Sequence, residues 1–293
     1  MSETVISRRT ALASMAGGAV VGTIHQTASA GSSTKTERKG RIKQSVSRWC
    51  YDSVLPWDPF AKACAEMGLV GIDLVDQELW PVVQKYGLVA TMVPGAGTIR
   101  DGTNDKANHP KMIEQFGKNI KAAAENKLPN VITFSGNRRN ISDEEAWENS
   151  AVLLKEAVKI AEDEGITICM ELLNSKVDHK DYQCDHTVWG VELCKRVDSP
   201  RFKLLYDIYH MQIMEGDIVR TIRDNIQYIA HFHTGGNPGR KDLDDTQELN
   251  YVPIMNAIAE LTEQGRFSGY VAHEFVPKSG MDSLRAAVDL CDV

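Results

Sequence analysis

The chain alternates short apolar runs with longer amphipathic segments from about residue 42 to its end, without an internal repeat. A strand that is regularly followed by a helix favours a parallel sheet, because parallel neighbours need a crossover connection. Strands are predicted at residues 42–49, 70–75, 88–93, 130–135, 166–171, 202–207, 228–233 and 269–274. Eight such units predict a single α/β domain, a (β/α)₈ TIM barrel, which takes about 250 residues.

The helices between these strands are predicted from their period and end signals. Ser142 and Glu145 form a capping box, and Gly165 follows the end of that helix. A doubly wound sheet is the alternative fold, but it usually carries a glycine-rich phosphate turn after its first strand, and this chain has none there. Helices are expected at residues 59–67, 110–126, 142–164, 187–197, 213–225, 252–263 and 281–290, with specificity-shaping loops at 95–109 and 175–185.

The N-terminus differs in kind from the rest of the chain. The pair Arg8-Arg9 precedes a weakly apolar segment at residues 11–24 and a small-residue cleavage pattern, Ala-Ser-Ala, at 28–30. This order is typical of a twin-arginine export signal, so we expect a periplasmic protein. The predicted organisation is a signal peptide at residues 1–30, a linker at 31–40 and the barrel domain at 41–293.

Composition excludes several classes of protein. A formal charge of −7 and a pI near 5.7 argue against a nucleic-acid binder, which normally has a basic face. No apolar stretch reaches the roughly 20 residues of a membrane span, so we expect no membrane association after signal removal. The six cysteines show no Cys-x-x-Cys spacing, which favours buried free thiols over a zinc site or disulfides.

Four metal-competent residues close the last four predicted strands: Glu171, Asp207, His233 and Glu274. Three carboxylates and an imidazole suit a hard or borderline divalent cation, and carboxylates clustered without a cation would repel one another. The carboxyl ends of barrel strands are also where such enzymes carry their chemistry. The sequence therefore predicts a metal site at the barrel mouth.

The period of two within strands predicts which residues share the inward face. In residues 166–171, Thr167 and Cys169 lie on the face of Glu171. In residues 228–233, we expect Ile229 and His231 to point inward with His233. The residues between them, Tyr228, Ala230 and Phe232, are expected to point outward. In the last strand, Tyr270, Ala272 and Glu274 are expected inward and His273 toward the helices.

Several motifs extend these positions: ELLN at residues 171–174, YDIYHMQ at 206–212, HFHTGGNPGR at 231–240, ELNY at 248–251 and HEF at 273–275. With these motifs the chain resembles the xylose isomerase-like barrel superfamily over residues 41–293. Within that superfamily it is most similar to the branch of hydroxypyruvate isomerases and ketose 3-epimerases.

The resemblance implies roles for individual residues. One divalent cation, usually Mn²⁺ or Mg²⁺, is bound by Glu171, Asp207, His233 and Glu274. Glu171 and Glu274 also form the catalytic proton-transfer pair. His210 and Arg240 hold substrate oxygens. Asn174, His231 and Glu248 are further substrate-binding candidates, although His231 is alternatively a residue behind the metal ligands and Glu248 a helix cap. Dimers and tetramers are common in the family, so a homo-oligomer is left open.

The predicted activity follows from this set of groups. A carboxylate removes a proton next to a carbonyl, and a divalent cation stabilises the resulting enediolate. Returning the proton to the neighbouring carbon isomerises a small hydroxy-carbonyl compound or sugar, and returning it to the opposite face epimerises it. The alternatives are a lyase or dehydratase of keto-sugars or 3-keto-glycosides, a non-catalytic periplasmic sugar-binding protein, and a DNA-repair endonuclease, which the acidic composition disfavours. We expect a small-molecule substrate.

Overall fold

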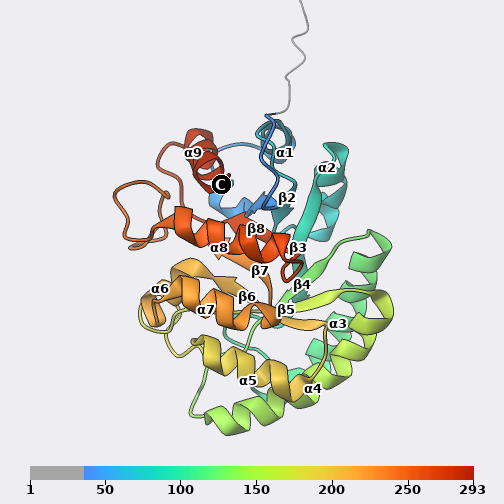
Figure 1. The fold of residues 1–293 in the computed structure, drawn as a ribbon. Coiled ribbons are helices and arrows are strands. Elements are labelled where there is room, and N and C mark those ends of the chain that lie inside the picture. Colours follow the sequence, from blue (N-terminus) through green and yellow to red (C-terminus); the bar gives the residue numbers. More distant parts are fainter. Residues whose placement is uncertain (1–35) are drawn as a thin grey trace, which may run out of the picture. The chain divides into compact units, whose positions relative to one another are not determined.

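The computed structural model describes residues 36–293 (Figure 1). The predicted export signal and the first half of the predicted linker lie outside the described residues. Residues 36–40 form no helix or strand, but they contact the barrel. Arg38 Nε–H donates to the Met67 carbonyl (2.8 Å), and its guanidinium pairs with Asp289 (2.5 Å). This part of the predicted linker is therefore attached to the folded domain.

Eight parallel strands form the central sheet, as predicted. The sheet order runs β1-β8-β7-β6-β5-β4-β3-β2, so the first strand pairs with the last. The ring closes between β1 and β2 through a parallel bridge of Ser47 and Asp73 and through the Val70 N–H, which donates to the Gln44 carbonyl (2.9 Å). The strands are β1 Gln44–Val46, β2 Gly71–Asp73, β3 Val89–Ala96, β4 Asn130–Thr133, β5 Thr167–Glu171, β6 Phe202–Asp207, β7 Ile229–Thr234 and β8 Tyr270–His273.

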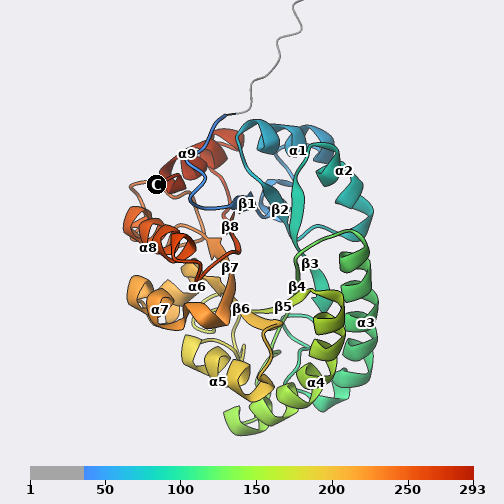
Figure 2. The same ribbon diagram turned by 45° about the vertical axis from the view of Figure 1, so that its right-hand side comes forward.

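Helices cover the outside of this ring (Figure 2). Ser142 accepts from the Glu145 N–H (3.2 Å), and Gly165 takes the left-handed conformation, as the predicted helix signals require. The helices are α1 Trp57–Glu66, α2 Trp80–Lys85, α3 His109–Glu125, α4 Asp143–Glu164, α5 Thr187–Val197, α6 Ile208–Met214, α7 Ile218–Asn225, α8 Tyr251–Glu263 and α9 Met281–Cys291.

Two helix predictions differ from the structure. The short helix α2 was not expected. The helix expected at residues 213–225 is instead two helices, α6 and α7, because Gly216 (φ +64°) and Asp217 (φ +46°) take left-handed backbone conformations that interrupt it. The second half of the barrel therefore carries one helix more than predicted.

The inward face of β7 corrects one prediction. The register between β6 and β7 shifts, so that Leu204 lies opposite Ile229 while Leu205 lies opposite His231. Ile229 consequently joins the apolar core under the helices, and Ala230 packs against the apolar cluster inside the barrel. The expected inward Ile229 and outward Ala230 were wrong because a bulge breaks the alternation. Beyond the bulge, His231 and His233 are inward, as expected.

The cysteines and the membrane-spanning potential of the helices can also be compared with the predictions. All six cysteines are buried and free, which confirms their predicted state. Within residues 36–293, no helix combines the length and the hydropathy needed to cross a bilayer.

Candidate active site

The four predicted metal ligands converge at the carboxyl ends of neighbouring strands. Glu171 and Asp207 are the last residues of β5 and β6, His233 lies near the end of β7, and Glu274 directly follows β8. One ligand atom from each residue lies within 4.8 Å of the others, and all four residues are buried. The parallel sheet produces this convergence, because it brings the ends of its strands to one face.

His233 lies at the centre of this cluster. Its Nδ1 is 2.6 Å from Glu274 Oε2, 3.1 Å from Glu171 Oε1 and 3.8 Å from Asp207 Oδ2. Burial opposes protonation of the ring, but the surrounding carboxylates raise the pKa of His233 well above its usual value. Nδ1 is therefore the point where positive charge meets the surrounding carboxylates.

Arg240 supplies the other positive charge. Its Nη2 donates to Asp207 Oδ2 (2.6 Å) and to Glu274 Oε2, and its guanidinium lies over the Tyr209 ring at 5.0 Å. Burial alone would raise the pKa values of Asp207 and Glu274, but Arg240 outweighs it and lowers both. By contrast, burial raises the pKa of Glu171 to about 7. The two glutamates thus lie in different electrostatic environments.

The charge balance of the cluster fits a cation. When Glu171 is ionised, the three carboxylates outnumber the two positive groups that face them, the His233 ring and the Arg240 guanidinium. Buried charge of this kind is normally paired or metal-bound. Three carboxylates with one imidazole match Mg²⁺ or Mn²⁺ better than they match softer metals.

His210 is held in place beside the cluster. Its Nδ1 accepts from Asn174 Nδ2–H (2.6 Å), and its Nε2 lies 2.9 Å from Arg240 Nη1. Burial lowers the pKa of His210 to about 3, so the ring is neutral. Asp178 completes the support, because its carboxylate accepts from Asn174 (2.7 Å) and from the Tyr209 hydroxyl (2.8 Å).

A cavity of about 370 Å³ opens onto the cluster. Both loops predicted to shape specificity contribute to its wall, through Ile99 and through Asp178 and His179. Trp49 is 45% exposed at its edge and donates from Nε1–H to Glu274 Oε1 (2.5 Å). The lining residues are Trp49, Leu74, Ile99, Ile132, Phe134, Glu171, Leu173, Asp178, His179, Tyr209, His210, Gly239, Arg240 and Glu274.

The five predicted substrate-binding residues occupy different places. Arg240 and His210 line the cavity. Asn174 is fully buried behind His210 and does not line it. His231 is also fully buried, below His233, which leaves it out of reach of a molecule in the cavity. Glu248 is exposed and accepts from Asn237 Nδ2 (2.6 Å), and it does not cap α8, whose N-cap is Asn250.

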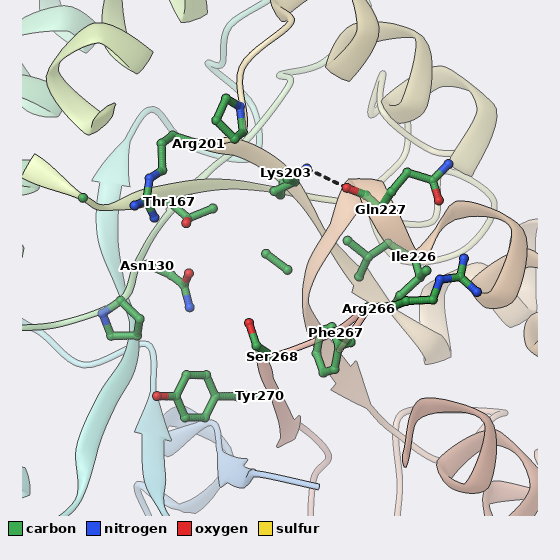
Figure 3. A pocket seen from close by; sticks show the side chains of 16 residues that line it. Asn130, Thr167, Arg201, Lys203, Ile226, Gln227, Arg266, Phe267, Ser268 and Tyr270 are labelled. Carbon is green, nitrogen blue, oxygen red and sulfur yellow. Dashed lines mark hydrogen bonds between the residues drawn. The ribbon is translucent and has the colours of Figure 1, made fainter. Parts of the chain in front are cut away.

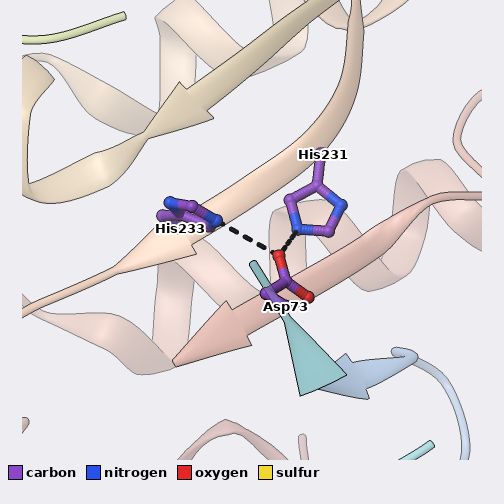
Figure 4. Close-up of side chains that lie close together, drawn as sticks. All are labelled: Asp73, His231 and His233. Atoms are coloured by element: carbon purple, nitrogen blue, oxygen red, sulfur yellow. Dashed lines mark hydrogen bonds and ion pairs between the residues drawn. The ribbon is translucent and has the colours of Figure 1, made fainter. Parts of the chain in front are cut away.

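Three groups near the site were not anticipated. Tyr209 and Asp178 support the polar wall, and Asp73 lies beneath His233 with His231 (Figure 4). Tyr209 lies inside the YDIYHMQ motif and Asp178 inside the loop at 175–185. Asp73 closes β2 and faces the barrel interior, which is the same signal that identified Glu171.

A second cavity of about 420 Å³ lies at the opposite, amino-terminal end of the strands (Figure 3). Arg201, Lys203 and Arg266 line it, and its lining contains no aspartate or glutamate. Lys203 donates from Nζ to the Gln227 carbonyl (2.6 Å). None of the predicted site residues lies in this cavity.

Comparison with known families tests the predicted resemblance. A family model described as xylose isomerase-like TIM barrel matches residues 46–290. The chain belongs to the xylose isomerase-like TIM barrel family. This confirms the predicted superfamily and the barrel architecture.

Relatives with assigned names include isomerases and an epimerase. The chain is 29% identical over 130 residues to a putative hydroxypyruvate isomerase of Danio rerio, covering 44% of this chain and 46% of the relative. It is 31% identical over 119 residues to a D-psicose 3-epimerase of Ruminiclostridium cellulolyticum, covering 41% and 39%. These alignments span less than half of each relative. A 2-oxo-tetronate isomerase of Pectobacterium atrosepticum aligns over 229 residues at 26% identity, covering 74% and 85%.

Solved structures share the fold. A family 2 AP endonuclease of Brucella melitensis superimposes with a TM-score of 0.74 at 20% identity, covering 84% of this chain and 96% of that one. A 3-keto-D-glucoside 4-epimerase of E. coli superimposes with a TM-score of 0.69 at 18% identity, covering 85% and 98%. At such identities the likeness concerns the barrel alone.

Proposed function

We propose that this protein is a divalent-metal-dependent isomerase or epimerase that acts on a small hydroxy-carbonyl compound or sugar. The observation that carries the proposal is the buried cluster of Glu171, Asp207, His233 and Glu274, which opens onto the 370 Å³ cavity. The names of the relatives, hydroxypyruvate isomerase, 2-oxo-tetronate isomerase and D-psicose 3-epimerase, support the same reaction class.

The cluster would hold one cation, Mn²⁺ or Mg²⁺, through its three carboxylates and His233 Nδ1. Bound there, the cation supplies Lewis-acid stabilisation of the negative charge that develops on substrate oxygens. To act as a ligand, His233 Nδ1 would have to be unprotonated and offer its lone pair to the cation.

Glu171 and Glu274 are proposed to move the proton. Both side chains line the cavity, and they come from β5 and β8, strands separated by two others in the ring. The Trp49 Nε1–H holds one oxygen of Glu274 and thereby orients the carboxylate. Two carboxyl groups reaching one substrate from different strands allow removal of a proton at one position and its return at another.

Arg240 and His210 are proposed to orient the substrate. A guanidinium and an imidazole side by side present hydrogen bonds to neighbouring hydroxyl and carbonyl oxygens. Ile99 and Phe134 add apolar side chains to the cavity lining and would help to exclude water from the reacting carbon.

Metal analysis and proton exchange test the proposal together. The purified protein is incubated in D₂O with hydroxypyruvate, several ketoses and a 3-keto-glucoside, each with and without chelator, and followed by NMR. Metal-dependent deuterium incorporation at one carbon supports the proposal and identifies the substrate class. Release of a leaving group from the 3-keto-glucoside would establish the lyase alternative instead. Absence of both metal and exchange would overturn the proposed site.

Export to the periplasm by the twin-arginine route is also proposed, on the pattern of Arg8, Arg9 and residues 28–30. Cell fractionation tests it. Replacing both arginines by lysine is expected to retain the protein in the cytoplasm, and periplasmic recovery of that variant would contradict the proposal. A homo-oligomer stays a prediction, which light scattering checks.

A further inference from the structure

Asp73, His231 and His233 form a second polar group (Figure 4), which shares His233 with the cluster of three carboxylates at the barrel mouth. All three residues have 0% exposure. Asp73 Oδ2 lies 2.5 Å from His231 Nε2 and 3.2 Å from His233 Nε2. His233 therefore belongs to two clusters at once, with Nδ1 among the carboxylates of the barrel mouth and Nε2 against Asp73.

The second oxygen of Asp73 is equally occupied. The Ser45 hydroxyl donates to Asp73 Oδ1 (2.7 Å), and the Thr91 hydroxyl donates to the same oxygen. Four groups therefore face the two oxygens of Asp73, and each of them can donate a hydrogen bond to the carboxylate. An ionised carboxylate only accepts hydrogen bonds, so each ring nitrogen that faces it must carry a proton.

We propose that Asp73 is a positioning residue that holds His233 in its Nε2–H form, so that the Nδ1 lone pair is directed at the cation. The assignment rests on the proposed function, because it presumes that Nδ1 is a metal ligand. A ligand histidine whose other nitrogen donates to a carboxylate is fixed in both tautomer and ring orientation. Asp73 acts through His233 and does not touch the substrate, since it does not line the cavity.

The same three residues do not make a second cation site. The Asp73 oxygens already accept from two hydroxyls and two ring nitrogens, which leaves no lone pair for a metal. A cation between Asp73 and the two rings would also need both Nε2 atoms deprotonated. His231 instead packs edge-on against the His233 ring, with centroids 5.4 Å apart, and shares Oδ2 with it. His231 thus helps to hold the ring plane.

The test compares Mn²⁺ binding by the full-chain protein and by Asp73→Asn, measured calorimetrically. An amide of the same shape offers both a donor and an acceptor, so it no longer selects the Nε2–H form. We expect an affinity about 10- to 100-fold weaker. The matched control is Ser45→Ala, which removes a hydrogen bond from the same carboxylate but leaves its contact with His233. The Mn²⁺ affinity of Ser45→Ala is expected to change by less than about threefold, because this substitution reaches His233 only indirectly.

A second measurement does not depend on the variant folding. In the Mg²⁺-loaded protein, ¹⁵N NMR of the histidine rings is expected to show His233 protonated at Nε2 and unprotonated at Nδ1. The opposite tautomer overturns the inference, as does an Asp73→Asn protein that binds Mn²⁺ normally. If the unaltered protein binds two equivalents of Mn²⁺ and Asp73→Asn binds only one, Asp73 is itself a ligand, and the inference is also overturned. Absence of Mn²⁺ binding by the unaltered protein overturns the proposed function, and this inference with it.

Discussion

The two ends of the barrel hold cavities of similar size but of opposite chemistry. The carboxyl-terminal end has about 370 Å³ beside three buried carboxylates, and the amino-terminal end has about 420 Å³ beside Arg201, Lys203 and Arg266. Within residues 36–293, none of these three cations pairs with a carboxylate, and Arg266 is exposed to solvent. Volume alone does not distinguish a functional site, whereas burial and convergence of charge do.

Single strands contribute residues to both cavities. β6 places Lys203 toward one end and Asp207 toward the other, four residues apart on the inward face, and β5 does the same with Thr167 and Glu171. A barrel strand thus separates its amino-terminal and carboxyl-terminal inward residues by its own length. The contrast between the two ends is therefore testable by substitutions at each end of the barrel.

The largest effect is expected from Glu274→Gln, which keeps the shape of the side chain and removes its proton-transfer capacity. Turnover should fall by about 10²- to 10⁴-fold, the usual contribution of general acid–base catalysis. Steady-state kinetics on the substrate found by deuterium exchange measure it. The control is Glu156→Gln, which alters an exposed glutamate of α4 outside the cavity and should leave the activity unchanged. A fully active Glu274→Gln enzyme would remove this residue from the mechanism.

The second largest effect is expected from removal of the cation. Chelation is expected to abolish proton exchange, and Mn²⁺ or Mg²⁺ should restore it. Because the cation binds only the folded protein, saturation at 100 times its Kd should add about 2.7 kcal/mol to the free energy of unfolding. Thermal melting with and without Mn²⁺ measures this. Equal melting temperatures and chelator-resistant exchange would contradict a metal site at the carboxyl-terminal end.

Arg240→Ala should have an intermediate effect. Hydrogen bonds from a charged group contribute about 1.5–3 kcal/mol, so KM should rise by roughly 10- to 100-fold while kcat changes less. The ratio of the two kinetic constants is the measurement. Arg240→Lys keeps the charge and should recover part of the loss. An unchanged KM would place the substrate away from the wall that Arg240 forms.

The smallest effect is expected at the opposite end of the barrel. Lys203→Gln and Arg266→Gln remove cations that line the amino-terminal cavity, and kcat/KM should stay within about twofold of the original, as for surface substitutions far from the chemistry. A larger loss in either variant would show that the amino-terminal cavity takes part in the reaction, and the contrast drawn here would fail.

Much of this site was predictable because it follows from strand periodicity. Glu171, Asp207, His233 and Glu274 close their strands on inward faces, and parallel strands must bring such residues together. Asp73 obeys the same rule, because it is the last residue of β2, but the strand predicted from the sequence continued to residue 75. Asp73 was missed because it lay inside the predicted strand and not at its end.

Other features depend on backbone conformations that the sequence does not display. The bulge at Ala230 has no glycine or proline to mark it, so the inward and outward residues of β7 were misassigned at its start. Arg240 reaches the carboxylates from a loop position with φ +51°, which no local period predicts. The division between α6 and α7 involves Gly216, a residue typical of helix ends, and Asp217, which tolerates the left-handed region but does not require it.

The pairing of β1 with β8 has a consequence for folding while the chain is being synthesised. Residues 44–46 are made early, but their edge that faces β8 finds its partner only when residues 271–273 have been made. Until then β1 and β7 both present open edges, which are ready templates for association with other chains. A chain cut short before residue 270 would lack Glu274 and would also be left as an unclosed sheet. Translation must therefore pass residue 274 before either the ring or its chemistry exists.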